Sequence, residues 1–308
     1  MSNFTKRLIL TLTCIPLMIF SLFFPRDNHI LIALVYGVLV TIIGSYEINS
    51  LIYHKGISVK RIFLPVVNFL IFIFACLYAN NYFNIRSFKP LFPLFLVFII
   101  AIISFIYARD IFKQDLAKSF EKMSYTLFGL LYIGVPSFIF PFLFNISNNP
   151  ENPVPLFLNV DSKGTLMGSL LALYYITIVW TSDIFAYVFG MAFGRNNVIG
   201  LAASPKKSWA GYIGGYLSTF VFVAIFYILF DRFIGFPLWL YFSIPVISGI
   251  LVPVGDLVES VFKRSANIKD SGDVIMGRGG ILDSVDSILY MLPIYFLLLQ
   301  VYFAFRQL

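Results

Sequence analysis

The strongest constraint on this chain is a series of apolar runs, each long enough to cross a lipid bilayer. A membrane-spanning helix needs about 20 mostly apolar residues. Such runs lie near residues 8–25, 30–46, 62–80, 90–108, 124–144, 165–190, 209–230, 236–255 and 286–305. Hydrophobic residues make up 59% of the sequence and charged residues only 12%, which argues against an ordinary soluble domain. We therefore predict an all-α fold, a polytopic membrane helical bundle of about nine transmembrane helices.

Lysine and arginine are distributed unevenly between the loops of such a bundle. If the N-terminus is cytoplasmic, 16 of the 22 Lys and Arg residues fall in cytoplasmic segments. Cytoplasmic loops of membrane proteins carry this excess. We expect a multi-pass protein of the cell (inner) membrane with a cytoplasmic N-terminus and its site facing the cytoplasm. Membrane lipid is an expected partner. Nucleic acid is not expected, because no basic soluble domain is predicted. A homodimer is one possible oligomeric state.

The polar motifs are concentrated in the second half of the chain. We predict N-terminal transmembrane helices over residues 1–164 and a C-terminal transmembrane catalytic region over residues 165–308. Glu47 is an acid of the first half, near the inner end of the second apolar run. It could be a solvated residue at a helix end or reach a site, and we favour the solvated residue.

Asp183 lies within an otherwise apolar run. A carboxylate inside a membrane costs about 2.5–3.5 kcal/mol on insertion scales, so by default it predicts a functional residue. The alternative is a buried aspartate that is hydrogen-bonded to a neighbouring helix.

The sequence Ser-Pro-Lys-Lys-Ser at positions 204–208 precedes the next apolar run. Ser204 is predicted to cap that helix, with Pro205 in its first turn. Backbone N–H groups at a helix start attract anions, and Lys206 and Lys207 beside them favour a phosphate site. Alternatively, the two lysines only anchor the helix at the inner membrane surface.

Acidic residues gather between the last two apolar runs. Asp256 and Glu259 are three residues apart, with Lys263 on the same helical face, and Asp283 and Asp286 repeat this spacing at the start of the last run. If these two helix ends face each other, three or four of these carboxylates meet. Mg²⁺ is bound by a few carboxylates together with substrate phosphates. We therefore predict metal ligation by Asp256, Glu259, Asp283 and Asp286.

The cations and glycines of the same segment suit a phosphate ligand. Arg264, Lys269 and Arg278 would neutralise charge on a transferring phosphoryl group. Gly279 and Gly280 leave the backbone free to approach an anion closely. A solvated charged loop is the alternative, and it explains the charge density but not the acids at both helix ends.

Three blocks of sequence resemble the phosphatidate cytidylyltransferases, also called CDP-diacylglycerol synthases. The first block is Asp183-x-x-Ala186-Tyr187-x-x-Gly190 and the second is Ser204-Pro205-Lys206-Lys207-Ser208-Trp209. The third runs from Gly255-Asp256-Leu257-x-Glu259-Ser260-x-x-Lys263-Arg264 into Lys269-Asp270-Ser271-Gly272, Gly279-Gly280, Asp283 and Asp286. The resemblance covers most of residues 165–290, and the three blocks are specific only in combination.

The resemblance implies an enzyme that joins the cytidylyl group of CTP to the phosphate of phosphatidate and releases pyrophosphate, with Mg²⁺ as cofactor. It implies catalytic roles for Asp256, Lys263, Arg264, Lys269, Asp283 and Asp286. It also implies substrate binding by Asp183, Ser204, Lys206, Lys207, Arg278, Gly279 and Gly280.

The chain departs from the family pattern at Met276, Arg278, Ser284 and Ala210, where proline, histidine, arginine and glutamate are usual. Arginine can supply charge but no proton transfer near neutral pH. Other interpretations are therefore a CTP-dependent lipid kinase, a cytidylyltransferase for another lipid phosphate, and a catalytically silent paralogue or lipid transporter.

Overall fold

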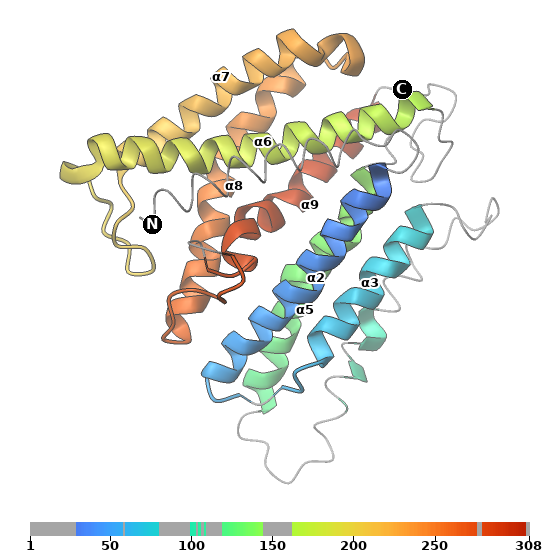
Figure 1. Ribbon diagram of the computed structural model, residues 1–308, viewed down its shortest axis with the longest axis vertical. Helices are drawn as coiled ribbons and strands as arrows, with labels where there is room; N and C mark the ends of the chain where they lie inside the picture. Colours follow the sequence, from blue (N-terminus) through green and yellow to red (C-terminus); the bar gives the residue numbers. More distant parts are fainter. Residues whose placement is uncertain are drawn as a thin grey trace.

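The computed structural model describes residues 29–57, 59–79, 99–102, 104–105, 108, 119–143, 162–275 and 279–305. Its named helices are α2 (His29–His54), α3 (Phe63–Ala79), α5 (Ser119–Leu143), α6 (Ser162–Phe193), α7 (Trp209–Ile234), α8 (Leu238–Ser265) and α9 (Leu282–Phe305) (Figure 1). A short 3₁₀ helix, η1, covers Gly194–Asn196. Within this part of the chain there are isolated β-bridges but no strand, so the all-α prediction is confirmed there.

Six of these helices are long and apolar enough to cross a membrane, and α3 is a shorter apolar helix. Large apolar side chains such as Val221 and Ile228 of α7 are exposed, as a lipid-facing surface requires. The protein is therefore a multi-pass membrane protein. Of the nine predicted spans, the one at 8–25 and most of the one at 90–108 lie outside the described residues.

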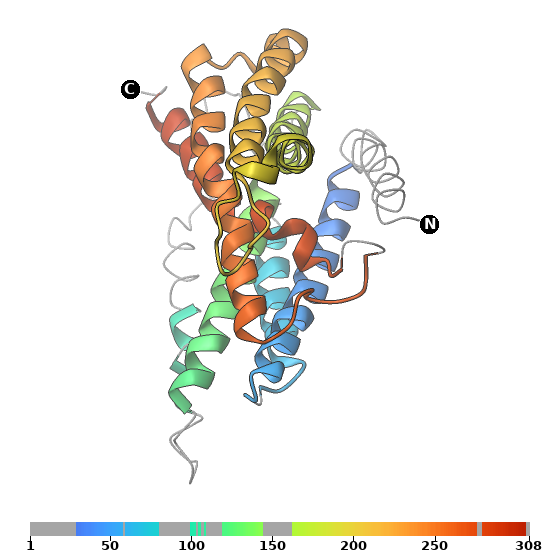
Figure 2. The same cartoon turned by 90° about the vertical axis from the view of Figure 1, so that its left-hand side faces the viewer.

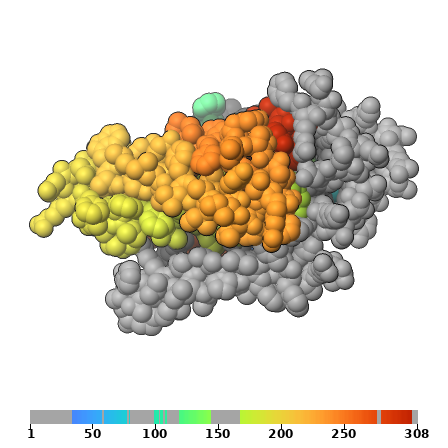
Figure 3. All heavy atoms as spheres, turned by 90° about the horizontal axis from the view of Figure 1, so that it is seen from above, coloured from blue at the N-terminus to red at the C-terminus, as the bar shows by residue number. Residues whose placement is uncertain are grey.

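The helices form three groups that contact one another. Helices α2, α3 and α5 pack together, α6 packs along α7, and α8 packs along α9. In Figure 1, α6 runs across the view, whereas α2, α3 and α5 run roughly parallel to one another and at an angle to α6. Figure 3 shows α6 and α7 side by side on one face. Contacts of α5 with α9 and of α7 with α8 join the groups. The pair α8–α9 therefore lies between the other two groups.

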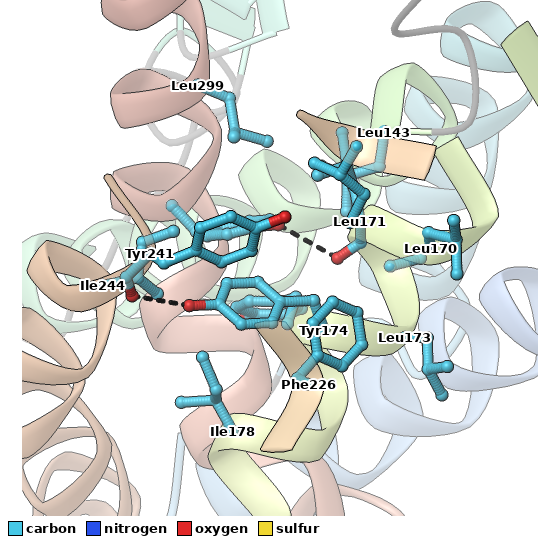
Figure 4. Packing of buried hydrophobic residues seen from close by; sticks show 14 of the residues in the cluster. Leu143, Leu170, Leu171, Leu173, Tyr174, Ile178, Phe226, Tyr241, Ile244 and Leu299 are labelled. Carbon is cyan, nitrogen blue, oxygen red and sulfur yellow. Dashed lines mark hydrogen bonds between the residues drawn. The ribbon is translucent and has the colours of Figure 1, made fainter. Parts of the chain in front are cut away.

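A hydrogen bond from a buried tyrosine connects α6 to α8 in the core. Tyr174 of α6 donates its hydroxyl to the backbone oxygen of Tyr241 in α8 at 2.7 Å (Figure 4). Pro245 lies four residues after Tyr241 and has no N–H to donate to that oxygen. A backbone oxygen without a partner is costly inside a membrane. The Tyr174 hydroxyl therefore replaces the helical hydrogen bond that Pro245 removes.

Two helix boundaries differ from the prediction in a way that matters for the site. Helix α8 continues to Ser265 instead of ending near residue 255, and α9 begins at Leu282 instead of residue 286. Apolar character ends at the first charged residue, but the helix does not, because Glu259 and Lys263 pair one turn apart. The four predicted metal ligands therefore all lie within the two helices.

Candidate functional site

Three of the four predicted metal ligands converge between α8 and α9. Carboxylate oxygens of Asp256, Glu259 and Asp286 all lie within 4.8 Å of one another. The two helices come close here because Gly255 has no side chain: a Cβ atom at that position would lie 2.9 Å from Cα of Ser287. Ser287 also donates its hydroxyl to the backbone oxygen of Val252 at 3.0 Å. Close backbone packing thus brings the acids of the two helices together.

Two lysines partly neutralise the negative charge of this carboxylate cluster. Lys207 Nζ lies 2.7 Å from Oδ2 of Asp256, and Lys263 Nζ lies 2.5 Å from Oε2 of Glu259. Glu259 is only 2% exposed, and its other oxygen, Oε1, has no hydrogen-bond partner among the described residues. Asp286 is 6% exposed. The cluster therefore keeps buried acceptor oxygens, and these hard oxygen ligands fit Mg²⁺.

The fourth predicted ligand, Asp283, is engaged on its other side by the segment between α8 and α9. One of its oxygens accepts from the backbone N–H groups of Ser271 (2.8 Å) and Gly280 (2.7 Å) and from the Ser271 hydroxyl (2.9 Å). Its other oxygen pairs with Lys263. Lys263 therefore links Asp283 to Glu259, and Asp283 joins the cluster through this lysine.

Gly279 and Gly280 lie against these carboxylates. The backbone of Gly279 has φ of 109°, which side-chain-bearing residues rarely adopt. A Cβ atom at Gly280 would lie 2.5 Å from a Glu47 oxygen and 2.2 Å from the Ser271 hydroxyl. Within the structure both glycines allow the segment to wrap around protein carboxylates. Their predicted approach to a phosphate stays a prediction.

The interpretation of Glu47 as a solvated residue was wrong. Glu47 lies inside α2, which continues to His54, and is only 5% exposed. Its carboxylate accepts hydrogen bonds from the start of α9, far away along the chain. Figure 2 shows the segment between α8 and α9 reaching α2.

The prediction that Ser204 caps the helix after it was also wrong. Helix α7 begins at Trp209, and its N-cap is Ser208, whose side chain accepts from the backbone N–H of Gly211. Ser204 instead lies in a turn, where its N–H donates to the backbone oxygen of Leu201 at 3.0 Å. The loop before α7 is therefore four residues longer than predicted. Lys207 lies in this loop and contacts Asp256.

The remaining predicted residues differ in their exposure to the surroundings. Lys206, Arg264 and Lys269 are exposed, and Arg264 donates to the backbone oxygen of Ile268 at 3.0 Å. Asp183 is half-buried in α6, within electrostatic range of Asp286. Met276 and Arg278 lie outside the described residues.

The departures Ala210 and Ser284 lie in the first turns of α7 and α9 respectively. Ala210 donates its N–H to the side chain of Asn197 at 3.3 Å. The Ser284 hydroxyl is buried and has no hydrogen-bond partner among the described residues.

Tyr132 of α5 was not predicted to belong to the site. Its hydroxyl is buried and has no hydrogen-bond partner in the described part of the chain. It lies within electrostatic range of Asp286, Glu259 and Asp256. It is one of 18 tyrosines in a chain rich in aromatic residues, so no pattern in the sequence distinguishes it.

In the residues that the structure describes, the fold and the site define a helical, multi-pass membrane protein with a partly buried carboxylate cluster between two of its helices. The chain belongs to the cytidylyltransferase family, whose family model matches residues 5–302.

Several similar proteins are named phosphatidate cytidylyltransferase. One from Staphylococcus haemolyticus is 38% identical over 129 residues, which is 41% of this chain and 48% of that protein. One from Rickettsia bellii is 35% identical over 188 residues, 59% of this chain and 72% of that protein. One from Staphylococcus aureus is 39% identical over 130 residues, with 41% and 48% coverage. The chain thus spans about half the length of the staphylococcal relatives it matches.

Proposed function

We propose that this protein transfers the cytidylyl group of CTP to phosphatidate, forming CDP-diacylglycerol and pyrophosphate. Membership of the cytidylyltransferase family and the names of the similar proteins support this reaction. The observation that carries the proposal is the convergence of Asp256, Glu259 and Asp286, with Lys207 and Lys263 in contact with them. A cluster of acids and cations at this spacing suits a metal ion and a polyphosphate.

In the proposed reaction, a phosphate oxygen of phosphatidate attacks the α-phosphorus of CTP. The bond from that phosphorus to the bridging oxygen breaks, and pyrophosphate leaves with the electron pair. No protein nucleophile is needed, so the side chains act by positioning and by stabilising charge.

Asp256, Glu259 and Asp286 would hold Mg²⁺, and Asp283 would support them through Lys263. When bound, the ion supplies charge neutralisation for the phosphate oxygens. Lys207 and Lys263 hold ammonium groups beside the cluster, where phosphate oxygens would also bind. The exposed side chains of Lys206, Arg264 and Lys269 would attract the anionic substrates from the membrane surface. The proposed substrate-binding set is completed by Asp183, Ser204, Arg278, Gly279 and Gly280.

We further propose that the site faces the cytoplasm of a bacterial inner membrane, with nine spans and a cytoplasmic N-terminus. The excess of Lys and Arg in the corresponding loops supports this orientation. The division into N-terminal helices (1–164) and a catalytic region (165–308) belongs to the same proposal. The contacts of Glu47 with the start of α9 indicate that the first part also supports the site.

Purified protein with CTP labelled at either the α- or the γ-phosphorus would test the reaction. Cytidylyl transfer puts the α-label into lipid when phosphatidate and Mg²⁺ are present, and releases the γ-label as pyrophosphate. A lipid kinase would instead transfer the γ-label to diacylglycerol and leave the α-label in CDP. Labelling of lipid by neither route, in membrane-inserted folded protein, would contradict the proposed function.

A further inference from the structure

Glu47 makes an unusual set of contacts for a carboxylate on a membrane helix. Its Oε1 accepts from the backbone N–H of Ile281 at 2.9 Å. Its Oε2 accepts from the backbone N–H of Leu282 at 2.7 Å and from the hydroxyl of Ser271 at 3.1 Å. All of these donors belong to the segment that precedes and opens α9. Glu47 thus caps α9 from another helix.

The chemistry of a helix start explains why a carboxylate is suited to this place. The first N–H groups of a helix have no partner within the helix, and the helix dipole favours a negative charge there. The fit is tight, since a Cβ atom at Gly272 would lie 2.8 Å from Oε1 of Glu47 and one at Gly280 would lie 2.5 Å from it. Glu47 therefore holds the segment between α8 and α9 at two places, around Ser271 and at its junction with α9.

Ser271 connects this cap to the carboxylate cluster. Its hydroxyl lies 3.1 Å from Glu47 and 2.9 Å from Asp283. A hydroxyl has one proton and can donate to only one of the two carboxylates at a time. Asp283 also pairs with Lys263, which contacts Glu259. A continuous chain of contacts therefore joins Glu47 to the cluster.

We propose that Glu47 is a positioning residue for the metal site, an inference that rests on the proposed function. Leu282, which Glu47 caps, lies one helical turn before Asp286 on the same side of α9. Fixing the backbone at Leu282 therefore fixes the direction from which Asp286 approaches Asp256 and Glu259. Glu47 acts through α9 and through Ser271, without contacting substrate.

The substitution Glu47→Gln tests this role with almost no change in side-chain volume. An amide has a single acceptor oxygen, and its NH₂ group faces donors, so at least one backbone N–H of α9 loses its partner. We expect turnover to fall and the Mg²⁺ concentration for half-maximal turnover to rise about 10- to 100-fold, as is typical for residues that support metal ligands. The KM for phosphatidate should stay unchanged. Glu121→Gln on the exposed start of α5 is the matched control.

Hydrogen exchange of the metal-free protein gives a second readout that is independent of activity. In Glu47→Gln, the amides of residues 281–286 should exchange faster, whereas those of α6 and α7 should not change. Unchanged exchange at 281–286, or an unchanged Mg²⁺ dependence in an active variant, would overturn the proposal.

If Glu47→Gln fails to fold, Ser271→Ala removes only the linking hydroxyl and should shift the Mg²⁺ dependence in the same direction. An unaltered Mg²⁺ dependence in Ser271→Ala would then count against the link. A wild-type protein that is inactive with CTP and phosphatidate would overturn the proposed function, while hydrogen exchange would still decide whether Glu47 holds the start of α9.

Discussion

At the scale of single residues, the balance of charge in the carboxylate cluster decides what the site can bind. Two like charges about 4 Å apart repel by about 4 kcal/mol at an effective dielectric constant of about 20. Asp256, Glu259 and Asp286 converge to within this range, and Lys207 and Lys263 contact only two of them. A third cationic contact would relieve the remaining repulsion. The cluster is therefore suited to a divalent cation.

Removing one charge from this cluster tests its role. We expect Asp286→Asn to lower Mg²⁺-dependent cytidylyl transfer by at least about 100-fold, because the isosteric amide removes a charged ligand from a buried site. Initial rates measured over a range of Mg²⁺ concentrations would check this. Asp273→Asn, at an exposed position of the same segment, is the matched control and should keep its activity within about twofold. Equal activity of both variants would remove Asp286 from the site.

Lys207 provides a separate test of phosphate binding. The substitution Lys207→Met removes the ammonium group beside Asp256 but keeps a long unbranched side chain. We expect the KM for CTP to rise by about tenfold or more, since a hydrogen bond to a charged group contributes about 1.5–3 kcal/mol. Steady-state kinetics at saturating Mg²⁺ would measure this change. Lys60→Met, exposed in the loop after α2, serves as the control, and a KM that does not differ between the two variants would contradict a role in phosphate binding.

At the scale of helices, proline and tyrosine compensate for each other in the core. Pro245 leaves the backbone oxygen of Tyr241 without its helical donor, and Tyr174 supplies one from α6. This contact thus explains how a proline is accommodated inside a buried membrane helix.

Tyr174→Phe should destabilise the protein by about 1 kcal/mol, because it removes the hydroxyl and keeps the ring contacts. A thermal unfolding experiment in detergent would show this as a lower Tm than that of the wild type. Tyr46→Phe, at an exposed position of α2, is the control and should leave Tm nearly unchanged. The loss should be smaller in a Pro245→Ala background, where the backbone N–H of the substituted residue can donate to the Tyr241 oxygen; an equal loss in both backgrounds would refute the compensation.

At the scale of the whole molecule, the helices of the first half and the carboxylate cluster of the second half are not independent. Helix α2 holds the start of α9 through Glu47, and α5 packs against α9 and carries Tyr132 towards the cluster. Truncation of the first helices would therefore disturb the site as well as the membrane insertion. The polar motifs therefore depend on helices from both halves of the chain.

The proposed orientation can be measured on intact cells. Helix α7 crosses the molecule from the loop with Lys206 to its end near Arg232. In a chain whose native cysteines are replaced by serine, a membrane-impermeant maleimide should label Arg232→Cys in intact spheroplasts. It should label Lys206→Cys only in inside-out vesicles. The opposite pattern would place the site on the outer face.

Much of the fold follows from the sequence because membrane helices satisfy their backbone hydrogen bonds within one segment. The seven runs that fall within the described residues each correspond to a helix, and the spacing of Asp256, Glu259 and Lys263 correctly places them on one face of α8. The helix ends were less predictable. Paired charges prolong α8 beyond its apolar part, and Ser208 rather than Ser204 caps α7.

Local pattern therefore indicated which segments are helical and which acids belong to the cluster. Tertiary structure alone decided which acids meet. Asp283 and Asp286 are three residues apart, as Asp256 and Glu259 are, and nothing in the sequence distinguishes one from the other. The close contact at Gly255 sets the rotation of α9 and turns Asp286 towards Asp256 and Glu259. Glu47 caps a residue 235 positions away. A contact at that separation depends on how the helices pack, and no short-range pattern encodes it.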